Sequence, residues 1–183
     1  IVGDVKNVIT EMISLAKEKV DGSKYAGWRE TVANFDKLHP LSYEDSDEVI
    51  KPQWAIERLG QLLGDDANIT TDVGQHQMWA AQFFPFNKPR HWITSGGLGT
   101  MGFGMPAAVA ASLRHPGTPV VALIGDGGFL MTGTELATAI RHQARLVAIV
   151  ANNGSYGTIR LHQEKHYPGR VKATELVNPD FAA

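Results

Sequence analysis

Two nearly continuous apolar runs constrain the fold of this chain more than any other feature. Pro119–Ile124 and Arg145–Ala151 each have the pattern of a strand that is buried on both faces, and a helical segment, Leu136–His142, lies between them. Strands of this kind belong to parallel sheets with helices on both faces. We therefore predict an α/β fold, with a parallel sheet covered by helices on both sides.

The same alternation extends toward the N-terminus. Apolar spacing predicts helices over residues 52–63, 74–84 and 106–114, and strands over residues 67–73 and 90–94. The sequence Thr132-Gly133-Thr134-Glu135 has the form of a capping box at the start of the helix that follows it.

The chain is predicted to have three parts. Residues 1–20 contain a helix, because their apolar residues recur at helical spacing, and residues 21–50 are polar and aperiodic, which indicates a linker. Residues 51–183 form the regular α/β domain. The acidic run 44–48 lacks the spacing and the glycine of a calcium loop, so we expect it to be solvated. Neither end looks natural, and we expect an excised piece of a longer protein, truncated at its C-terminus.

Composition narrows the function classes. The 183 residues include no cysteine, which excludes disulfides, zinc–thiolate sites and thiol catalysis. A net charge of −2 gives no reason to expect nucleic acid or a membrane surface as partner. The apolar runs are far shorter than the roughly 20 residues that span a bilayer. We expect a cytoplasmic protein.

The strand that ends at Ile124 is followed by Gly125-Asp126-Gly127-Gly128. Glycines allow a sharp turn and the close approach of a ligand, and the following helix offers free N–H groups to an anion. Asp126 adds a hard oxygen ligand for a cation. A diphosphate with Mg²⁺ satisfies all three features, since Mg²⁺ is often held by a few protein groups together with phosphates. Taken alone, this turn is more often a simple tight connection.

The next strand is followed by Asn152-Asn153-Gly154-Ser155. If the two strands are neighbours, they lie about 4.8 Å apart, so Asp126 and an Asn reach the same ion. The glycines at 154 and 157 allow the loop to present a backbone carbonyl, that of Ser155, as a third ligand. Asn-Asn-Gly alone is most often a turn. The two turns at consecutive strand ends are much more specific than either one.

These motifs resemble those of thiamine-diphosphate-dependent enzymes. The Gly-Asp-Gly and Asn-Asn turns have the spacing of that family, and 73-VGQHQMWAAQFF-84 and 94-TSGGLGTMGFGMPAA-108 are similar to the acetolactate synthase (acetohydroxyacid synthase) large subunit. The similarity runs from about Lys51 to the end of the chain and implies the C-terminal thiamine diphosphate/Mg-binding domain, with residues 1–20 as the tail of the middle domain.

The resemblance implies a role for particular residues. Asp126, Asn153 and the Ser155 carbonyl would hold Mg²⁺, Gly127 and Gly128 would place amides on the diphosphate, and Met101 would wedge the cofactor into its bent shape, with Gly99 close to the pyrimidine ring. For His76 and Met101 the plainer alternatives are a surface histidine and core filler. Arg160, His162 and His166 are either solvated or part of a substrate channel. The full set of implied cofactor-binding residues is Val73, Gly74, Gln75, His76, Gly99, Met101, Gly125, Asp126, Gly127, Gly128, Asn153, Ser155, Tyr156 and Gly157.

The resemblance also implies an activity, a 2-oxoacid decarboxylase or carboligase whose partners are a 2-oxo acid and the pyrimidine-binding domain of a second subunit in a homodimer or tetramer. The activating glutamate lies in that other domain, so no catalytic residue is expected in this chain, and the piece alone is expected to be inactive. FAD in the parent enzyme is left open. So are two alternatives: a benzoylformate- or oxalyl-type decarboxylase without carboligation, and a non-catalytic domain that binds a nucleotide or diphosphate.

Two departures from the synthase pattern leave the substrate open. Many synthases have Gln-His-Leu-Gly after the Asn pair, whereas this chain has Gly154-Ser155-Tyr156-Gly157, which is closer to benzoylformate decarboxylase. His162 stands where the synthase has a tryptophan in its substrate channel.

Overall fold

The computed structural model describes residues 2–182 in two compact units, one ending at Ser42 and the other beginning at Tyr43. The first unit contains α1 (Val5–Lys19) and α2 (Ala26–Leu38), connected through a short 3-10 turn. The side chain of Asp4 caps α1 by accepting a hydrogen bond from the Asn7 N–H at 3.1 Å. No residue of either helix is buried.

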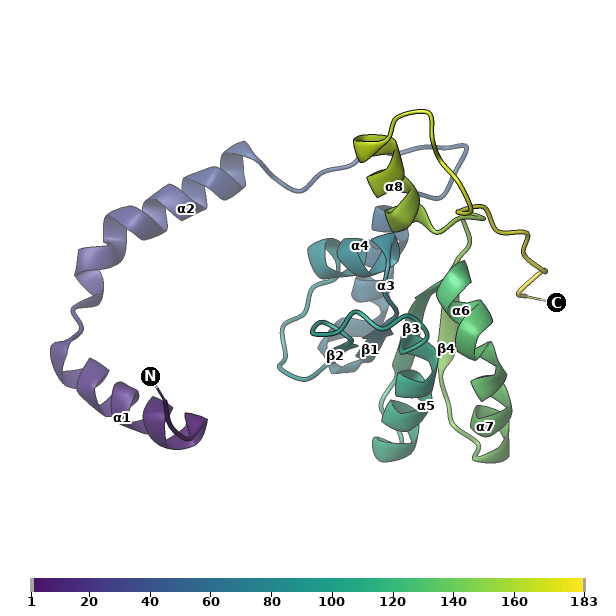
Figure 1. Ribbon diagram of the computed structural model, residues 1–183. Coiled ribbons are helices and arrows are strands. Elements are labelled where there is room, and N and C mark those ends of the chain that lie inside the picture. Colours follow the sequence, from purple (N-terminus) through teal and green to yellow (C-terminus); the bar gives the residue numbers. More distant parts are fainter. Residues whose placement is uncertain (1, 183) are drawn as a thin grey trace. The chain divides into compact units, whose positions relative to one another are not determined.

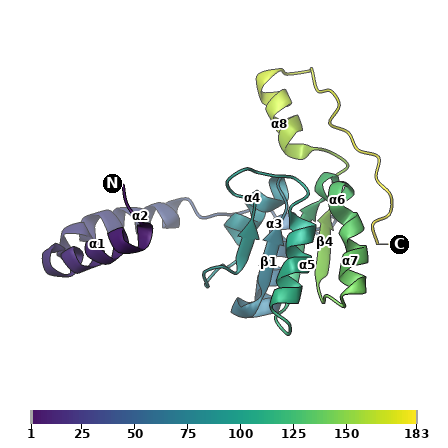
Figure 2. The same ribbon diagram turned by 60° about the horizontal axis from the view of Figure 1, so that its bottom comes forward.

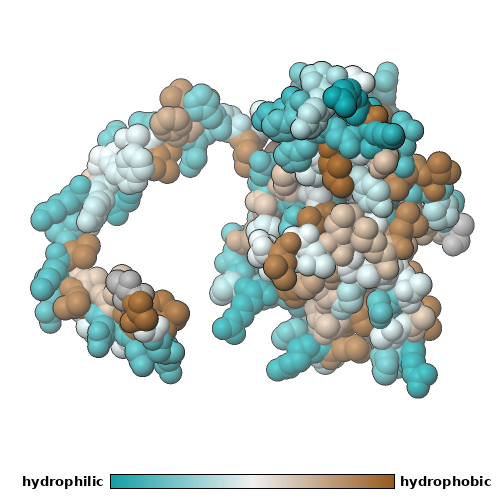
Figure 3. Space-filling model, viewed as in Figure 1, coloured by the Kyte–Doolittle hydropathy of each residue, from teal (hydrophilic) through white to brown (hydrophobic). Residues whose placement is uncertain are grey.

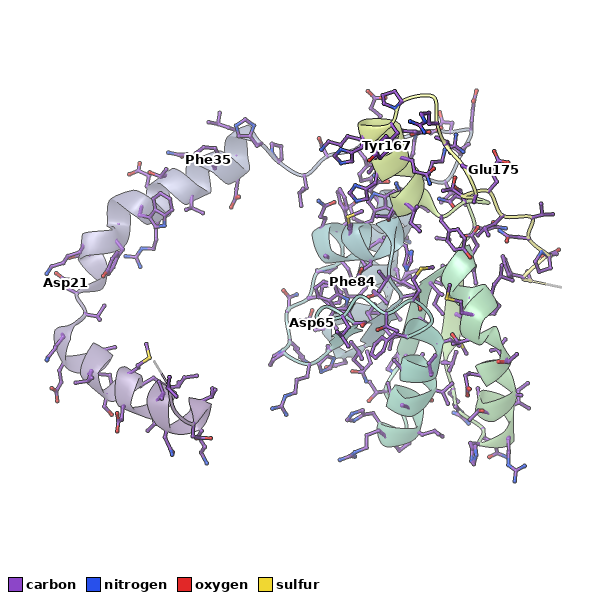
Figure 4. All side chains as sticks on the ribbon, viewed as in Figure 1. Asp21, Phe35, Asp65, Phe84, Tyr167 and Glu175 are labelled. Carbon is purple, nitrogen blue, oxygen red and sulfur yellow. The ribbon has the colours of Figure 1, made fainter. Side chains whose placement is uncertain are left out.

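The helix α2 lies in a segment that was expected to be aperiodic, and that expectation is wrong. Trp28, Val32 and Phe35 stand four and three residues apart, which is the spacing of one helical face. Phe35 is labelled on this helix in Figure 4.

The second unit is built on a four-stranded sheet. Its strands β1 (Asn68–Thr71), β2 (Trp92–Thr94), β3 (Val120–Gly125) and β4 (Val147–Ala151) are all parallel, in the order β2-β1-β3-β4. Figure 1 shows the sheet with the helices around it. The last residues of β3 and β4, Gly125 and Ala151, are paired in register, so these two strands are neighbours.

Helices cover both faces of the sheet, which confirms the predicted α/β class (Figures 1 and 2). Alternate residues of β3 separate the two cores. Val121 and Leu123 pack with α3 (Pro52–Leu63) and α4 (Gln75–Phe83). Val120, Ala122 and Ile124 pack with α5 (Gly104–Arg114) and α7 (Leu136–Arg141). Since β3 is buried on both faces, its apolar residues need not alternate with polar ones.

Several local expectations differ from the structure. The helix α6 (Asp126–Thr132) begins directly after β3, and α8 (Gly157–His166) follows β4, where no helix was predicted. The prediction of a capping box at Thr132 is wrong, because the Thr132 hydroxyl donates a hydrogen bond to the carbonyl of Gly102 at 3.0 Å instead of capping a helix. The helix α5 begins at Gly104 rather than Pro106, since proline is tolerated within a first turn.

The order of the strands fixes where a ligand fits. The chain passes from β1 to β2 on one side and then to β3 on the other side of β1. Open α/β sheets bind ligands at the carboxyl ends of the strands where the order reverses, and here that point lies between β1 and β3. Among residues 2–182, no helix is both long enough and apolar enough to cross a membrane.

Candidate cofactor site

A cavity of about 860 Å³ opens at the carboxyl ends of β1, β3 and β4. Residues from each of the turns that follow these strands line it, together with Gly99 and Met101 from the loop before α5. Every residue in the predicted cofactor and metal set is among the lining residues, although those residues come from distant parts of the sequence. The structure therefore brings the predicted set together at one place, and the binding role of each member stays a prediction.

The turn after β3 contributes the only carboxylate in the predicted metal set. Asp126 is the first residue of α6 and is 3% exposed. Its Oδ1 accepts a hydrogen bond from the N–H of Gly127 at 3.0 Å. Gly127 has no side chain because Tyr156 occupies that space, and a Cβ there would lie 2.5 Å from the Tyr156 ring. A Cβ on Gly128 would overlap the carboxylate of Asp72. Both glycines therefore make room for side chains from other turns.

The turn after β4 curls back on itself. Asn153 Oδ1 accepts a hydrogen bond from the Ser155 N–H at 3.0 Å, which forms an Asx turn. Gly154 has a φ of 63°, a left-handed conformation that favours glycine. The carbonyl oxygen of Asn153's side chain retains a second lone pair, so the turn leaves it able to ligate a cation.

The turn after β1 buries a histidine. His76 is 7% exposed, so the alternative that it is a surface histidine is wrong. Its ring lies between two glycines, and a Cβ on either Gly74 or Gly125 would be 3.0 Å from it. Burial lowers the pKa of His76 below its usual 6.5, while the neighbouring carboxylates of Asp72 and Asp126 act in the opposite direction. His76 Nε2 has no hydrogen-bond partner among the described residues.

The loop that carries Met101 is held by Asp72, a residue that the sequence analysis missed. Asp72 is fully buried, and its two carboxylate oxygens accept hydrogen bonds from the backbone N–H groups of Gly102, at 3.1 Å, and Gly104, at 2.9 Å. The N–H of Val73 donates to the same carboxylate at 2.9 Å. A charged residue directly after a buried strand was the available signal, because a buried carboxylate needs donors from elsewhere in the chain.

Three polar residues on α8 that were considered for a substrate channel do not line the cavity within the part of the chain that is described. Arg160 pairs with Glu164 at 2.9 Å, and the rings of His162 and His166 stack with centroids 6.1 Å apart. All three are exposed. Figure 3 shows the hydrophilic surface of α8 on this unit.

The predicted metal ligands at the two turns are all oxygen atoms. No group of three or more His, Cys, Asp or Glu side chains that could hold a metal ion occurs among residues 2–182. Asp126, Asn153 and the Ser155 carbonyl would supply one carboxylate and two neutral oxygens. Oxygen ligands of this kind suit Mg²⁺, which takes its remaining ligands from phosphate and water.

Comparison with known proteins identifies the family of the chain. Residues 72–183 match the family model of the thiamine pyrophosphate enzymes, described as their C-terminal TPP binding domain. The chain is 45% identical over 189 residues to the acetolactate synthase of Mycobacterium bovis, covering 99% of the chain and 31% of that protein. It is 40% identical over 182 residues to the acetolactate synthase large subunit of Lactococcus lactis, covering 99% of the chain and 31% of that subunit.

A third relative has a similar identity and a similar coverage. The chain is 40% identical over 187 residues to the acetolactate synthase isozyme 3 large subunit of Escherichia coli, covering 99% of the chain and 32% of that subunit. The chain thus spans about a third of the length of these relatives. The similarity that the motifs indicated is confirmed.

Proposed function

This chain belongs to the thiamine pyrophosphate (thiamine diphosphate) enzymes as their C-terminal cofactor-binding domain, and we propose that it binds thiamine diphosphate together with Mg²⁺ for an acetolactate-synthase-like 2-oxoacid decarboxylase or carboligase. One observation carries the proposal: the turns after β1, β3 and β4 and the loop at Met101 line a single cavity at the switch point of the sheet.

The residues present fit the diphosphate of the cofactor and the Mg²⁺ ion bound with it. Asp126 and Asn153 would ligate the ion through their side chains and Ser155 through its backbone carbonyl, with diphosphate oxygens and water completing the coordination. His76 lines the cavity with an unpartnered, buried Nε2, and its lowered pKa favours the neutral imidazole. A neutral imidazole with its proton on Nε2 would donate a hydrogen bond to a diphosphate oxygen. The backbone amides of Gly127 and Gly128 would do the same.

The remaining steps belong to other parts of the enzyme. When bound, thiamine diphosphate supplies the electron sink for decarboxylation and carbon–carbon bond formation. We propose that this chain binds and orients the cofactor, with Met101 beneath it, while the activating glutamate comes from the pyrimidine-binding domain of a second subunit. The parent would then be a homodimer or tetramer that acts on a 2-oxo acid. The cytoplasmic location stays a prediction of the sequence, and whether the parent also binds FAD is left open.

The loop after β4 favours a second candidate for the substrate. Gly154-Ser155-Tyr156-Gly157 is closer to the loop of benzoylformate decarboxylase than to that of the synthases, and Tyr156 lies in the cavity wall. A benzoylformate- or oxalyl-type decarboxylase would release its product without joining it to a second carbonyl compound. Product analysis with the full-length protein separates the two candidates, because only a carboligase forms a longer carbon skeleton.

The binding proposal is tested by calorimetric titration of the full-length protein with thiamine diphosphate, in Mg²⁺ and in EDTA. We expect binding that requires the metal and is lost in Asp126→Ala. Asp65→Ala is the matched control, since Asp65 is an exposed carboxylate outside the cavity. Binding in EDTA as tight as in Mg²⁺, or unchanged binding in Asp126→Ala, would overturn the proposal. Binding of ADP in preference to thiamine diphosphate would instead support a non-catalytic nucleotide-binding domain.

The expectation that the piece alone is inactive has its own test. The 183 residues contain the proposed diphosphate and metal ligands but not the other domain that would supply the glutamate. We expect no sustained decarboxylation of pyruvate by this chain alone, and sustained turnover of pyruvate by the isolated chain would contradict that expectation.

A further inference from the structure

The segment from Thr174 to Asn178 lies directly against the loop that follows β4. The carbonyl of Thr174 accepts hydrogen bonds from the Tyr156 N–H, at 2.9 Å, and from the Ser155 hydroxyl, at 3.0 Å. The Leu176 N–H donates to the carbonyl of Gly154 at 2.8 Å. Figure 4 labels Glu175 on this segment, whose backbone forms an antiparallel bridge with Ser155. The loop with two of the proposed metal ligands is thus held from outside by a later part of the chain.

Asn178 extends this contact from β4 to β3. Its Nδ2 donates to Asp126 Oδ2 at 2.7 Å and to Asn152 Oδ1 at 2.8 Å. Both partners are oxygens that only accept hydrogen bonds in these contacts, so the amide must present its NH₂ group to them. One side chain therefore connects the first residue after β3 with the first residue after β4.

These contacts fix the orientation of the Asp126 carboxylate. Its Oδ1 is held by the Gly127 N–H and its Oδ2 by Asn178, so both oxygens have a donor before any ion is considered. Each oxygen still has a lone pair for a cation. Asn178 Oδ1 is itself buried without a partner among the described residues, so the site has one more acceptor for a donor that enters with a ligand, such as a water on the ion.

We propose that Asn178 is a positioning residue for the metal site, holding the Asp126 carboxylate in its ligating orientation and tying the two metal-binding turns together. This inference rests on the proposed function. Groups that hydrogen-bond to metal ligands set the ligands' orientation, and their loss typically costs 10- to 100-fold in metal affinity. Because Asn178 contacts the proposed ligand Asp126 and is not among the residues that line the cavity, its removal should act on the metal first and on the cofactor only through the metal.

The test measures the Mg²⁺ dependence of thiamine diphosphate binding in the full-length protein, for Asn178→Ala and for wild type. We expect the Mg²⁺ concentration at half-maximal cofactor binding to rise about tenfold or more in the variant, and saturating Mg²⁺ to restore cofactor affinity. Asn87→Ala is the matched control, because Asn87 also donates to an aspartate, Asp65, at 2.8 Å, but on the exposed surface. Its Mg²⁺ dependence should equal that of wild type.

A second variant keeps the inference testable if Asn178→Ala is poorly folded. Asn152→Ala removes one of the two acceptors and leaves the bond to Asp126, so a smaller shift in the same direction is expected. An unchanged Mg²⁺ dependence in Asn178→Ala would overturn the inference and leave the proposed function standing. A loss of affinity that saturating Mg²⁺ does not restore would also overturn it, in favour of a purely structural role. Wild-type protein that shows no Mg²⁺-dependent binding would overturn both.

Discussion

Replacing Asp72 with alanine tests whether its buried carboxylate holds the Met101 loop. Two buried N–H groups, those of Gly102 and Gly104, would lose the acceptor that they have in the structure, and the partly buried N–H of Val73 would lose its acceptor as well. An unsatisfied buried donor costs about 1–3 kcal/mol, so the pair costs about 2–6 kcal/mol. Removing a buried carboxylate recovers part of that cost, because its desolvation is no longer required. We therefore expect the free energy of unfolding to fall by about 2–3 kcal/mol, in the lower half of that range.

The assay for Asp72→Ala is urea unfolding followed by tryptophan fluorescence, with the midpoint compared at an unchanged m-value. Asp72→Asn keeps the shape and one acceptor oxygen, so its loss should be smaller. Asp65→Ala is the control, because an exposed carboxylate should change stability by no more than about 0.5 kcal/mol. A loss in Asp72→Ala no larger than that of the control would refute the reasoning, since it would mean that water or backbone rearrangement satisfies the freed N–H groups.

Three further predictions concern the cavity and the core. Gly127→Ala should cost about 1–3 kcal/mol of unfolding free energy, because the new methyl meets the Tyr156 ring, and Tyr156→Ala in the same chain should recover much of that loss. Ile69→Ala, in a fully buried strand position, should cost about 2–5 kcal/mol in urea unfolding. Burial lowers the pKa of His76, so below pH 6.5 the unfolded chain binds a proton at this residue more readily than the folded chain does. The free energy of unfolding should therefore fall as the pH drops below 6.5, by at most about 1.4 kcal/mol per pH unit. His76→Asn should remove that part of the pH dependence, whereas His115→Asn, at an exposed histidine, should not. If the free energy of unfolding changes with pH equally in wild type and in His76→Asn, His76 is not the source of the pH dependence.

The strands and the site were predictable because each leaves a local pattern. The apolar run of β3 indicated burial on both faces, and glycines at its end indicated a turn that a ligand approaches closely. Those patterns placed Asp126 and Asn153 at the carboxyl ends of two strands, and the structure supplies the remaining condition, that β3 and β4 are neighbours. The helix α2 had a comparable signal in Trp28, Val32 and Phe35, and its polar surroundings obscured it.

What the sequence did not reveal are the contacts between turns. Asp72 and Asn178 carry no motif, and their importance depends on which backbone or side-chain groups the fold brings to them. The Thr132 hydroxyl illustrates the same limit, because local spacing indicated a helix cap whereas the tertiary structure gives it the carbonyl of Gly102. Local hydrogen bonds compete with tertiary ones, and only the assembled sheet decides between them.

The glycines of the cavity show why this site is a property of the fold as a whole. Gly127 makes room for Tyr156, Gly128 makes room for Asp72, and Gly125 makes room for the ring of His76. Each pair joins residues at the ends of different strands, so the shape of each turn depends on the order of the strands in the sheet. A ligand that binds only the completed cavity then stabilises the whole unit, by RT ln(1 + [L]/Kd). Residues that connect the turns without touching the ligand are therefore expected to affect binding and stability together, whereas residues that touch only the ligand are expected to affect binding alone.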